Sequence, residues 1–503
     1  MIRKIPATMG TQHPDNAAAP YWETDGDAFV NVHEEVRECT SAFADLGCEE
    51  YMWDWEGKFV DEAVVDRLFS EHHAFFKKRQ IGRDLFLTFR IPNIREEKGY
   101  SLGRALMGIL TAEDIARDLG FHRPPLFEVI LPMADSADKL LHIQKTFSAM
   151  AEFKHSLFGS AKNDFTYVEM IPLIEGVEHL FGIRALLEKF VELHRKQYGR
   201  APAYIRPFLA RSDPALVSGL VPAVLAVKAA ISEAYRFSQD SGIPVFPIVG
   251  AGSLIFRGGL APPRVKEFAA EYGGVRTATI QSGFRYDYPL EEVKKGIRYL
   301  NAHLAETKPL MLSRAEVAAA KVIAEKFTLP YRAAIKSLYK TVMAVADASP
   351  RRRERRLHIG LLGYGRKVGG KRFPRAINFT AALYSLGVPP EFLGLGRGYA
   401  SLTEAERSLL HKMYKHFKDE VVEAGRYINA ANLIKLRNSD RRWKAIGGDV
   451  AVMESALKTT FGPETMAQEL HAVETSALLI LFKNKKEFTD HIIHSGKLRR
   501  SLG

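Results

Sequence analysis

The chain has 503 residues, of which 46% are hydrophobic and 26% are charged, a balance typical of a soluble globular protein with one large domain or two. Its net charge of +12 favours anionic partners, although charge alone does not identify them. Only two cysteines are present and no apolar run reaches the length of a membrane span, which excludes a disulfide framework and a transmembrane segment.

The two thiols, Cys39 and Cys48, are expected to be reduced, as in an intracellular protein. The amino-terminal residues lack the apolar core of a signal peptide. We therefore expect a cytoplasmic protein with no membrane partner.

In the first 290 residues, short apolar segments alternate with stretches of helical periodicity. Strands are expected at 4–9, 50–55, 84–91, 126–132, 166–174, 203–209, 245–249 and 275–280. Helical stretches between them include 61–78, 102–118, 136–150, 177–197, 214–238 and 264–271. Strands separated by helices favour parallel pairing, and eight strands is the number that closes a (β/α)8 TIM-type barrel. A doubly wound open sheet is the alternative.

After residue 290 the pattern becomes mostly helical, over 291–347 and 400–503. We expect a barrel at 1–290 and a mainly helical part at 291–503, packed on it in one continuous domain. Between them, residues 351–375 hold ten Lys or Arg against one acid, Glu354. Such a segment is a polyanion-binding patch, a solvated loop or a subunit contact. Because no nucleic-acid motif accompanies it, we favour a solvated loop or a subunit contact and expect no nucleic-acid partner.

In a barrel of this type, the loops after the carboxyl ends of the strands hold the active site. The first strand leads into His13 within T-Q-H-P-D-N, and the third ends at Arg90, which is costly to bury without an anionic partner. The eighth strand leads into Gln281 and Arg285. The alternatives are that His13 is a structural histidine and that Arg90 pairs with a neighbouring glutamate.

A glycine-rich loop surrounds Arg257 after the seventh strand, with glycines at 250, 252, 258 and 259. Glycines allow positive φ and a close approach of backbone N–H groups to an anion, and arginine adds a planar cationic fork. We expect Arg257, Gly258 and Gly259 to contact a phosphate or carboxylate. A glycine-rich turn with a solvated arginine is the alternative.

Two carboxylates, Glu175 and Asp213, follow the fifth and sixth strands. Hard oxygens from neighbouring loops, completed by water and substrate oxygens, are typical of Mg²⁺ or Mn²⁺ sites, although either residue could instead stabilise a helix N-terminus. The convergent set predicts a site for a small, phosphate-bearing anion with a divalent metal. Its members are His13, Arg90, Arg211, Arg257 and Arg285 with Glu175 and Asp213.

Over essentially the whole chain, these motifs resemble the archaeal-type, or short-form, phosphoenolpyruvate carboxylases. The most specific stretches are T-M-G-T-Q-H-P-D-N (8–16), M-W-D-W-E-G-K (52–58), E-V-I-L-P-M (128–133), P-F-L-A-R-S-D-P-A (207–215), G-S-L-I-F-R-G-G (252–259), F-T-A-A-L-Y-S-L-G-V-P-P-E-F (379–392) and the final R-S-L-G. The resemblance implies a β/α barrel with added helices, usually a homotetramer. It also implies irreversible conversion of phosphoenolpyruvate and bicarbonate to oxaloacetate and phosphate with Mg²⁺ or Mn²⁺.

By resemblance to motifs of the long bacterial and plant enzymes, His13 is the catalytic histidine and Arg257 an active-site arginine. The same comparison implies Glu175 and Asp213 as metal ligands, and Arg90 is similar in setting to an arginine of their third strand. Two departures stand out: Leu216 occupies the position of a lysine, and no histidine precedes the F-R-G-G motif. We expect the missing charges from Arg206, Arg211, Arg285 or the basic loop at 366–371.

The resemblance further implies attack of bicarbonate on phosphorus, which yields carboxyphosphate and an enolate, with His13 taking up a proton. Trp53, Trp55 and Phe256 are expected to form apolar walls that exclude water, and Gly503 is expected to fold back toward the site. Two other functions are compatible with the sequence. One is a different barrel lyase or phosphotransferase acting on phosphoenolpyruvate or a 2-oxo acid, and the other is an RNA-binding protein that uses the basic segment.

Overall fold

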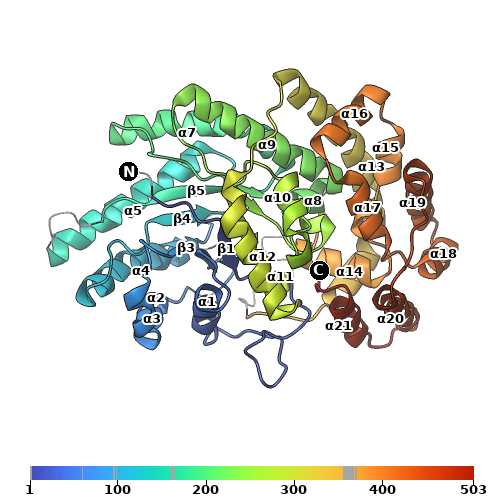
Figure 1. Ribbon diagram of the computed structural model, residues 1–503, viewed down its shortest axis with the longest axis horizontal. Coiled ribbons are helices and arrows are strands. Elements are labelled where there is room, and N and C mark those ends of the chain that lie inside the picture. Colours follow the sequence, from blue (N-terminus) through green and yellow to red (C-terminus); the bar gives the residue numbers. More distant parts are fainter. Residues whose placement is uncertain are drawn as a thin grey trace.

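Eight parallel strands close into a barrel, which confirms the predicted TIM-type fold and excludes the open sheet (Figure 1). Each strand pairs with the next, and the last pairs with the first through Thr8 and Ala278. The strands are β1 (Thr8–Thr11), β2 (Glu50–Asp54), β3 (Phe86–Arg90), β4 (Glu128–Leu131), β5 (Glu169–Ile174), β6 (Phe208–Ala210), β7 (Ile248–Gly250) and β8 (Thr277–Ile280). The computed structural model describes residues 3–503 except 59, 94–96, 98, 160–164, 355–366 and 369–370.

Helices cover the outside of the barrel. They are α1 (Glu35–Ala44), α2 (Val64–Glu71), α3 (His73–Lys78), α4 (Gly99–Asp118), α5 (Ala137–Phe158), α6 (Val177–Phe181), α7 (Ile183–Tyr198), α8 (Ser212–Ser218), α9 (Leu220–Ser241), α10 (Val265–Glu271), α11 (Ser282–Tyr286) and α12 (Leu290–His303). The helix predicted at 214–238 is broken at Gly219, whose φ of 96° lies outside the helical region. Two short 3₁₀ turns, η1 (Ile255–Arg257) and η2 (Pro262–Arg264), follow β7.

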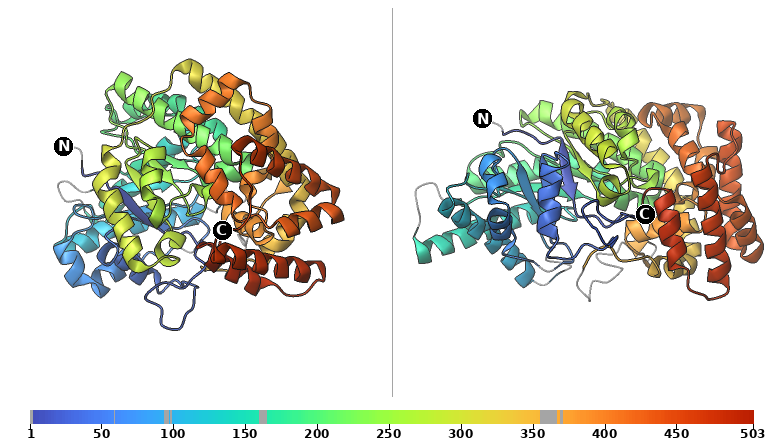
Figure 2. Two further views of the ribbon diagram at one scale, coloured as in Figure 1. Left: turned by 45° about the vertical axis from the view of Figure 1, so that its right-hand side comes forward. Right: turned by 60° about the horizontal axis from the view of Figure 1, so that its bottom comes forward.

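The rest of the chain is mainly helical and lies on one side of the barrel (Figures 1 and 2). Its long first helix, α13 (Arg314–Asp347), packs against α9, so the two parts share a hydrophobic core. The remaining helices are α14 (Ala376–Ser385), α15 (Leu395–Ala400), α16 (Glu404–Met413), α17 (Phe417–Gly425), α18 (Ala430–Ser439), α19 (Lys444–Leu457), α20 (Met466–Lys483) and α21 (Thr489–Leu498). Short elements complete this part: β9 (Lys367–Val368), β10 (Lys371–Arg372), η3 (Leu304–Glu306), η4 (Pro390–Phe392) and η5 (Arg441–Trp443).

Alternation along the strands decides which side chains enter the barrel. In β2, Met52 belongs to the interior cluster, whereas Tyr51 and Trp53 belong to the layer between strands and helices. Glu50 and Asp54, two residues before and after Met52, therefore lie inside at opposite ends of the barrel. Because side chains alternate along each strand, the barrel interior has a polar layer at each end.

The last residues of the chain return to the barrel, as the resemblance implied (Figure 2). The Leu502 N–H donates to the Asp15 carbonyl oxygen at 2.8 Å, and Ser501 Oγ donates to the same oxygen at 3.2 Å. Among the described residues, no helix is both long enough and apolar enough to cross a membrane.

Candidate active site

The glycine-rich loop after β7 folds tightly around the Arg257 side chain. Gly258 and Gly259 have φ values of 126° and 70°, so both need the freedom of glycine. A Cβ on Gly252 would lie 2.7 Å from Arg257 Nη1, which shows that the guanidinium lies directly on the backbone of Gly252. The glycines therefore set the place of the arginine as well as the shape of the loop.

Arg257 is buried and joins three distant parts of the chain. Its Nη1 donates to Asp15 Oδ2 at 2.9 Å and to the Gly503 carbonyl oxygen at 2.6 Å. Its Nη2 donates to Gln281 Oε1 at 2.6 Å. The loops after β1, β7 and β8 and the end of the chain thus converge on one guanidinium at the carboxyl end of the barrel.

His13 lies at the same end, two residues after β1. Its Nδ1 is 2.8 Å from Thr11 Oγ1. Burial and the nearby guanidiniums of Arg90 and Arg257 hold the pKa of His13 well below its usual value, against the opposing effect of Asp54. The imidazole is therefore neutral at pH 7 and able to accept a proton.

Arg90 ends β3 and is held by carboxylates of the neighbouring strand. Its Nε and Nη2 donate to the two oxygens of Asp54 at 2.8 and 2.6 Å, and its Nη1 lies 3.1 Å from Glu56 Oε2. The acidic neighbours, Asp54 first and also Glu175, raise the pKa of Arg90 against the opposing effect of burial. Arg375, at the start of α14, donates to Glu56 Oε1 at 3.0 Å and brings a further cation to the His13 neighbourhood.

The two predicted metal ligands follow adjacent strands, since β5 pairs with β6 through Ile174 and Leu209. Glu175 is almost fully buried and its Oε2 accepts the Met133 N–H at 2.8 Å. Asp213 lies in the first turn of α8 and is half-buried. Among the described residues, no three His, Cys, Asp or Glu side chains cluster as a complete ligand set. Two carboxylates from neighbouring loops fit a hard divalent cation that draws its other ligands from water and substrate.

Arg211 lies behind the glycine-rich loop. Its Nε donates to the Tyr272 hydroxyl at 3.0 Å, and its Nη1 and Nη2 approach the carbonyl oxygens of Phe256 and Ile255 at 3.4 and 3.5 Å. Arg211 therefore supports the backbone that carries Arg257, and its contact with substrate stays a prediction.

Arg285 lies beside the carboxyl end of β1. Its Nη2 donates to the Thr11 carbonyl oxygen at 2.6 Å and to Glu38 Oε1 at 2.9 Å, and Arg353 pairs with the same glutamate. Arg285 thus supports the end of β1, and its contact with substrate stays a prediction.

Arg206 lies at the opposite end of the barrel. Its guanidinium donates to both oxygens of Glu50, at 3.0 and 2.6 Å, to Glu128 Oε2 at 2.7 Å and to Thr277 Oγ1 at 3.1 Å. Glu50, Glu128 and Thr277 are at the starts of β2, β4 and β8. The prediction that Arg206 binds substrate is wrong, because this residue belongs to the polar layer at the amino end.

The predicted apolar walls belong to packed cores. Trp53 lies in the layer outside the barrel, and Trp55 stacks on Phe89 with ring centroids 4.0 Å apart. Phe256 packs against Tyr331 and Phe379. Trp53, Trp55 and Phe256 therefore do not form the predicted apolar wall of the site.

The structure also differs from the prediction for the described part of the basic segment 351–375. Arg352 is buried and donates to the carbonyl oxygens of Asn16 and Ala17, and the buried Arg353 pairs with Glu38. These two arginines hold the loop after β1, so they are neither solvated nor available to a polyanion. In the predicted loop at 366–371, Arg366 and the glycines at 369 and 370 lie outside the described residues.

Sequence reasoning missed the carboxylates Asp15, Asp54 and Glu56 as partners of the site's arginines, although all three lie within the motifs considered. It also missed Arg375, which it counted only as one of the cations of the segment 351–375.

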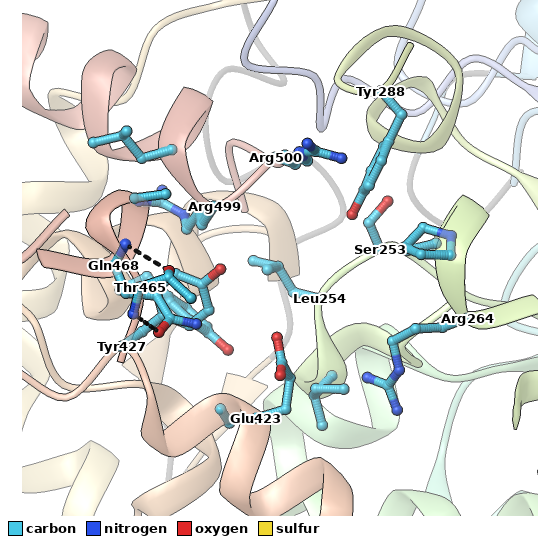
Figure 3. A pocket seen from close by; sticks show the side chains of 17 residues that line it. Ser253, Leu254, Arg264, Tyr288, Glu423, Tyr427, Thr465, Gln468, Arg499 and Arg500 are labelled. Carbon is cyan, nitrogen blue, oxygen red and sulfur yellow. Dashed lines mark hydrogen bonds between the residues drawn. The ribbon is translucent and has the colours of Figure 1, made fainter. Parts of the chain in front are cut away.

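A cavity of about 260 Å³ lies beside the glycine-rich loop, and Figure 3 shows Arg499, Tyr427 and Gln468 across it from Leu254 and Ser253.

Comparison with known proteins gives consistent matches over the whole chain. Residues 5–503 match a family model described as phosphoenolpyruvate carboxylase. The chain is 44% identical to the phosphoenolpyruvate carboxylase of Leuconostoc mesenteroides, covering 100% of this chain and 99% of that one. It is 42% identical to the Oenococcus oeni protein of the same name, over 95% of this chain and 94% of that one. It is 37% identical to the protein of that name from the archaeon Metallosphaera sedula, over the full length of both chains. Among solved structures, a Haloferax volcanii malate synthase in complex with lead(II) aligns with 84% of this chain and 99% of its own, at 11% sequence identity. Its TM-score of 0.37 is too low to support an argument about fold or function.

Proposed function

The chain belongs to the phosphoenolpyruvate carboxylase family, and from that premise we propose that it carboxylates phosphoenolpyruvate with bicarbonate at the carboxyl end of its barrel. The products are oxaloacetate and inorganic phosphate. The observation that supports this placement is the convergence of His13, Arg257 and Arg90, from two loops and the end of β3, at that end of the barrel.

Arg257 is the proposed phosphate-binding residue. Its guanidinium is fixed by Asp15, Gln281 and the Gly503 carbonyl oxygen before substrate arrives, so little reorganisation is needed on binding. Gly258 and Gly259 allow the backbone to approach the phosphate closely. Gln281 is proposed to orient Arg257 and to border the substrate.

His13 is the proposed general base. Transfer of the phosphoryl group from the enol oxygen to bicarbonate gives carboxyphosphate and the enolate of pyruvate. His13 accepts the proton of the carboxyphosphate carboxyl group as the carbon–oxygen bond to phosphate breaks, which releases CO₂. The methylene carbon of the enolate then attacks CO₂ to form oxaloacetate. A depressed pKa suits His13 to this task because the free imidazole predominates at neutral pH.

Glu175 and Asp213 would hold Mg²⁺ or Mn²⁺. When bound there, the cation supplies Lewis-acid stabilisation of negative charge on the enolate oxygen. Glu175 is oriented for this by the Met133 N–H, and Asp213 by its place in the first turn of α8. Arg90, fixed by Asp54, adds positive charge next to His13 and Glu175.

On the same family grounds, we propose a cytoplasmic homotetramer. Light scattering coupled to size exclusion would check the assembly, and a mass near that of one 56.4 kDa chain would contradict it.

The reaction itself is tested by coupling oxaloacetate formation to malate dehydrogenase. We expect turnover that requires phosphoenolpyruvate, bicarbonate and a divalent metal, each omitted in turn. Release of phosphate and pyruvate without bicarbonate dependence would instead indicate a phosphatase or a different lyase.

A further inference from the structure

The turn that carries Arg257 is anchored from the helical part of the chain. Glu391, in η4, accepts the Phe256 N–H through its Oε1 at 2.8 Å and the Tyr384 hydroxyl through the same oxygen at 2.8 Å. The contacts of Arg211 to the carbonyl oxygens of this turn, at 3.4 and 3.5 Å, are longer and therefore weaker. Among the described residues, Glu391 thus provides the shorter side-chain hydrogen bond to the backbone of η1.

Burying a glutamate at position 391 is energetically unfavourable. It is 1% exposed, and its Oε2 has no hydrogen-bond partner among the described residues. Burial raises the pKa of Glu391 to about 7, while hydrogen bonds from Tyr384 and Phe256 and the charge of Arg211 oppose the increase. An unpaired carboxyl oxygen in a core reduces stability, so packing alone does not explain a glutamate here.

A cavity borders the other side of the turn. Ser253, Leu254 and Ile255 line this cavity of about 260 Å³, and Figure 3 shows Ser253 and Leu254 at its wall. Leu254 and Ile255 are themselves buried, and the turn is closed by backbone hydrogen bonds from the Arg257 and Gly258 N–H groups to their carbonyl oxygens. The bond to Glu391 adds to these a contact from outside the loop. The Phe256 ring is packed against Phe379 and Tyr331, but the orientation of its peptide depends on polar contacts.

We propose that Glu391 is a positioning residue: it fixes the Ile255–Phe256 peptide, one residue before Arg257, and thereby sets where the guanidinium meets the phosphate of phosphoenolpyruvate. This inference rests on the proposed function. Phe256 directly precedes Arg257, and the Arg257 side chain lies on Gly252 with no slack, so a shift of the peptide moves the guanidinium. Misplacement by about 1 Å can cost about 100-fold in rate.

The test compares three variants by KM for phosphoenolpyruvate, kcat and thermal unfolding. Glu391→Met keeps the volume and removes the acceptor, so we expect a tenfold to hundredfold loss of kcat/KM, with a raised KM. Glu391→Gln keeps a carbonyl acceptor and should stay within about threefold of wild type. Tyr384→Phe removes only the second hydrogen bond to Glu391 and serves as the matched control, also within about threefold.

An unchanged KM in Glu391→Met, with activity reduced only in proportion to the folded fraction, would overturn the proposal. Equal damage in the Gln and Met variants would overturn it as well. If the Met variant does not fold, Glu391→Asp withdraws the acceptor by one methylene, and the same rise in KM is expected. Absence of oxaloacetate formation by the wild type in this series would contradict the proposed function instead.

Discussion

The two ends of the barrel both bury arginines, but their partners come from different sources. At the amino end, Arg206 binds Glu50, Glu128 and Thr277, which are at the starts of alternate strands. This is the layered packing of a barrel interior, with polar side chains in place of aliphatic ones. At the carboxyl end, the partners of Arg257 come from two loops and from Gly503, far apart in sequence.

The difference separates charge that is paired within the barrel from charge that we propose to be functional. At the amino end, the partners of Arg206 are residues at the strand starts, and Glu128 also accepts hydrogen bonds from Arg3 and Tyr204. The carboxyl end gathers His13, a neutral imidazole, with arginines held by loops and by the last residues of the chain. Burial and pairing therefore do not distinguish the two ends, whereas the origin of the partners does.

The largest expected effect is that of His13→Asn at the carboxyl end. Loss of the base should lower oxaloacetate formation by about 10³-fold, because general-base catalysis contributes effects of this size. Binding of phosphoenolpyruvate, measured by calorimetry without bicarbonate, should change little. Turnover at the wild-type rate would show that the carboxyl end does not work as described.

Arg206→Met should have the opposite profile. Leaving Glu50 buried without its arginine, and Glu128 with only Arg3 and Tyr204, should destabilise the fold by about 3–5 kcal/mol, whereas kcat of the folded enzyme should stay within about twofold. Denaturant unfolding and the coupled assay measure the two quantities on one preparation. A variant of normal stability without activity would contradict the assignment of this end to structure.

A smaller effect is expected for Gly252→Ala. The new methyl group would meet the Arg257 guanidinium at about 2.7 Å. Because this buried guanidinium is held by Asp15, Gln281 and Gly503, its displacement should also lower stability by about 1–3 kcal/mol. KM for phosphoenolpyruvate should rise about tenfold as the guanidinium is displaced. Gly448→Ala in α19, where a Cβ meets nothing within 4 Å, is the control and should leave KM unchanged.

The sequence predicted the barrel because its strands are short apolar runs between helices, and β2, β5 and β8 lie within the expected ranges. The first strand was misplaced, since β1 (Thr8–Thr11) is polar and glycine-containing and is defined by its pairing with β2 and β8. Arg206 was misassigned for a related reason: β6 begins only at Phe208, which puts Arg206 at the amino end.

The position of candidate residues at the carboxyl end was predictable where they directly follow strands, as for His13, Gln281 and the Arg257 loop. The position of Arg375 was not, because its approach to Glu56 depends on how the helical part packs on the barrel. The partners of Arg211 and Arg285 were equally hidden, since side-chain direction in a loop has no periodic signal.

The last prediction concerns stability alone, as a function of pH, at the anchor of the glycine-rich loop. The pKa of Glu391 is raised to about 7 in the folded chain, above its value when unfolded, so its favourable contribution is fully present below the unfolded pKa and is lost as pH rises through 7. Between pH 5 and 8, the wild type should lose about 2–3 kcal/mol of unfolding free energy relative to Glu391→Gln. If the unfolding free energies of the two proteins changed equally with pH, the assigned pKa of Glu391 would be contradicted.

The most direct test of the central claim is a crystal structure with Mn²⁺ and a non-reactive phosphoenolpyruvate analogue. We predict an anomalous peak at Glu175 and Asp213, with the analogue's phosphate on Arg257 and its carbon skeleton beside His13. A metal or phosphate bound elsewhere, with these side chains unoccupied at saturating ligand, would contradict the account.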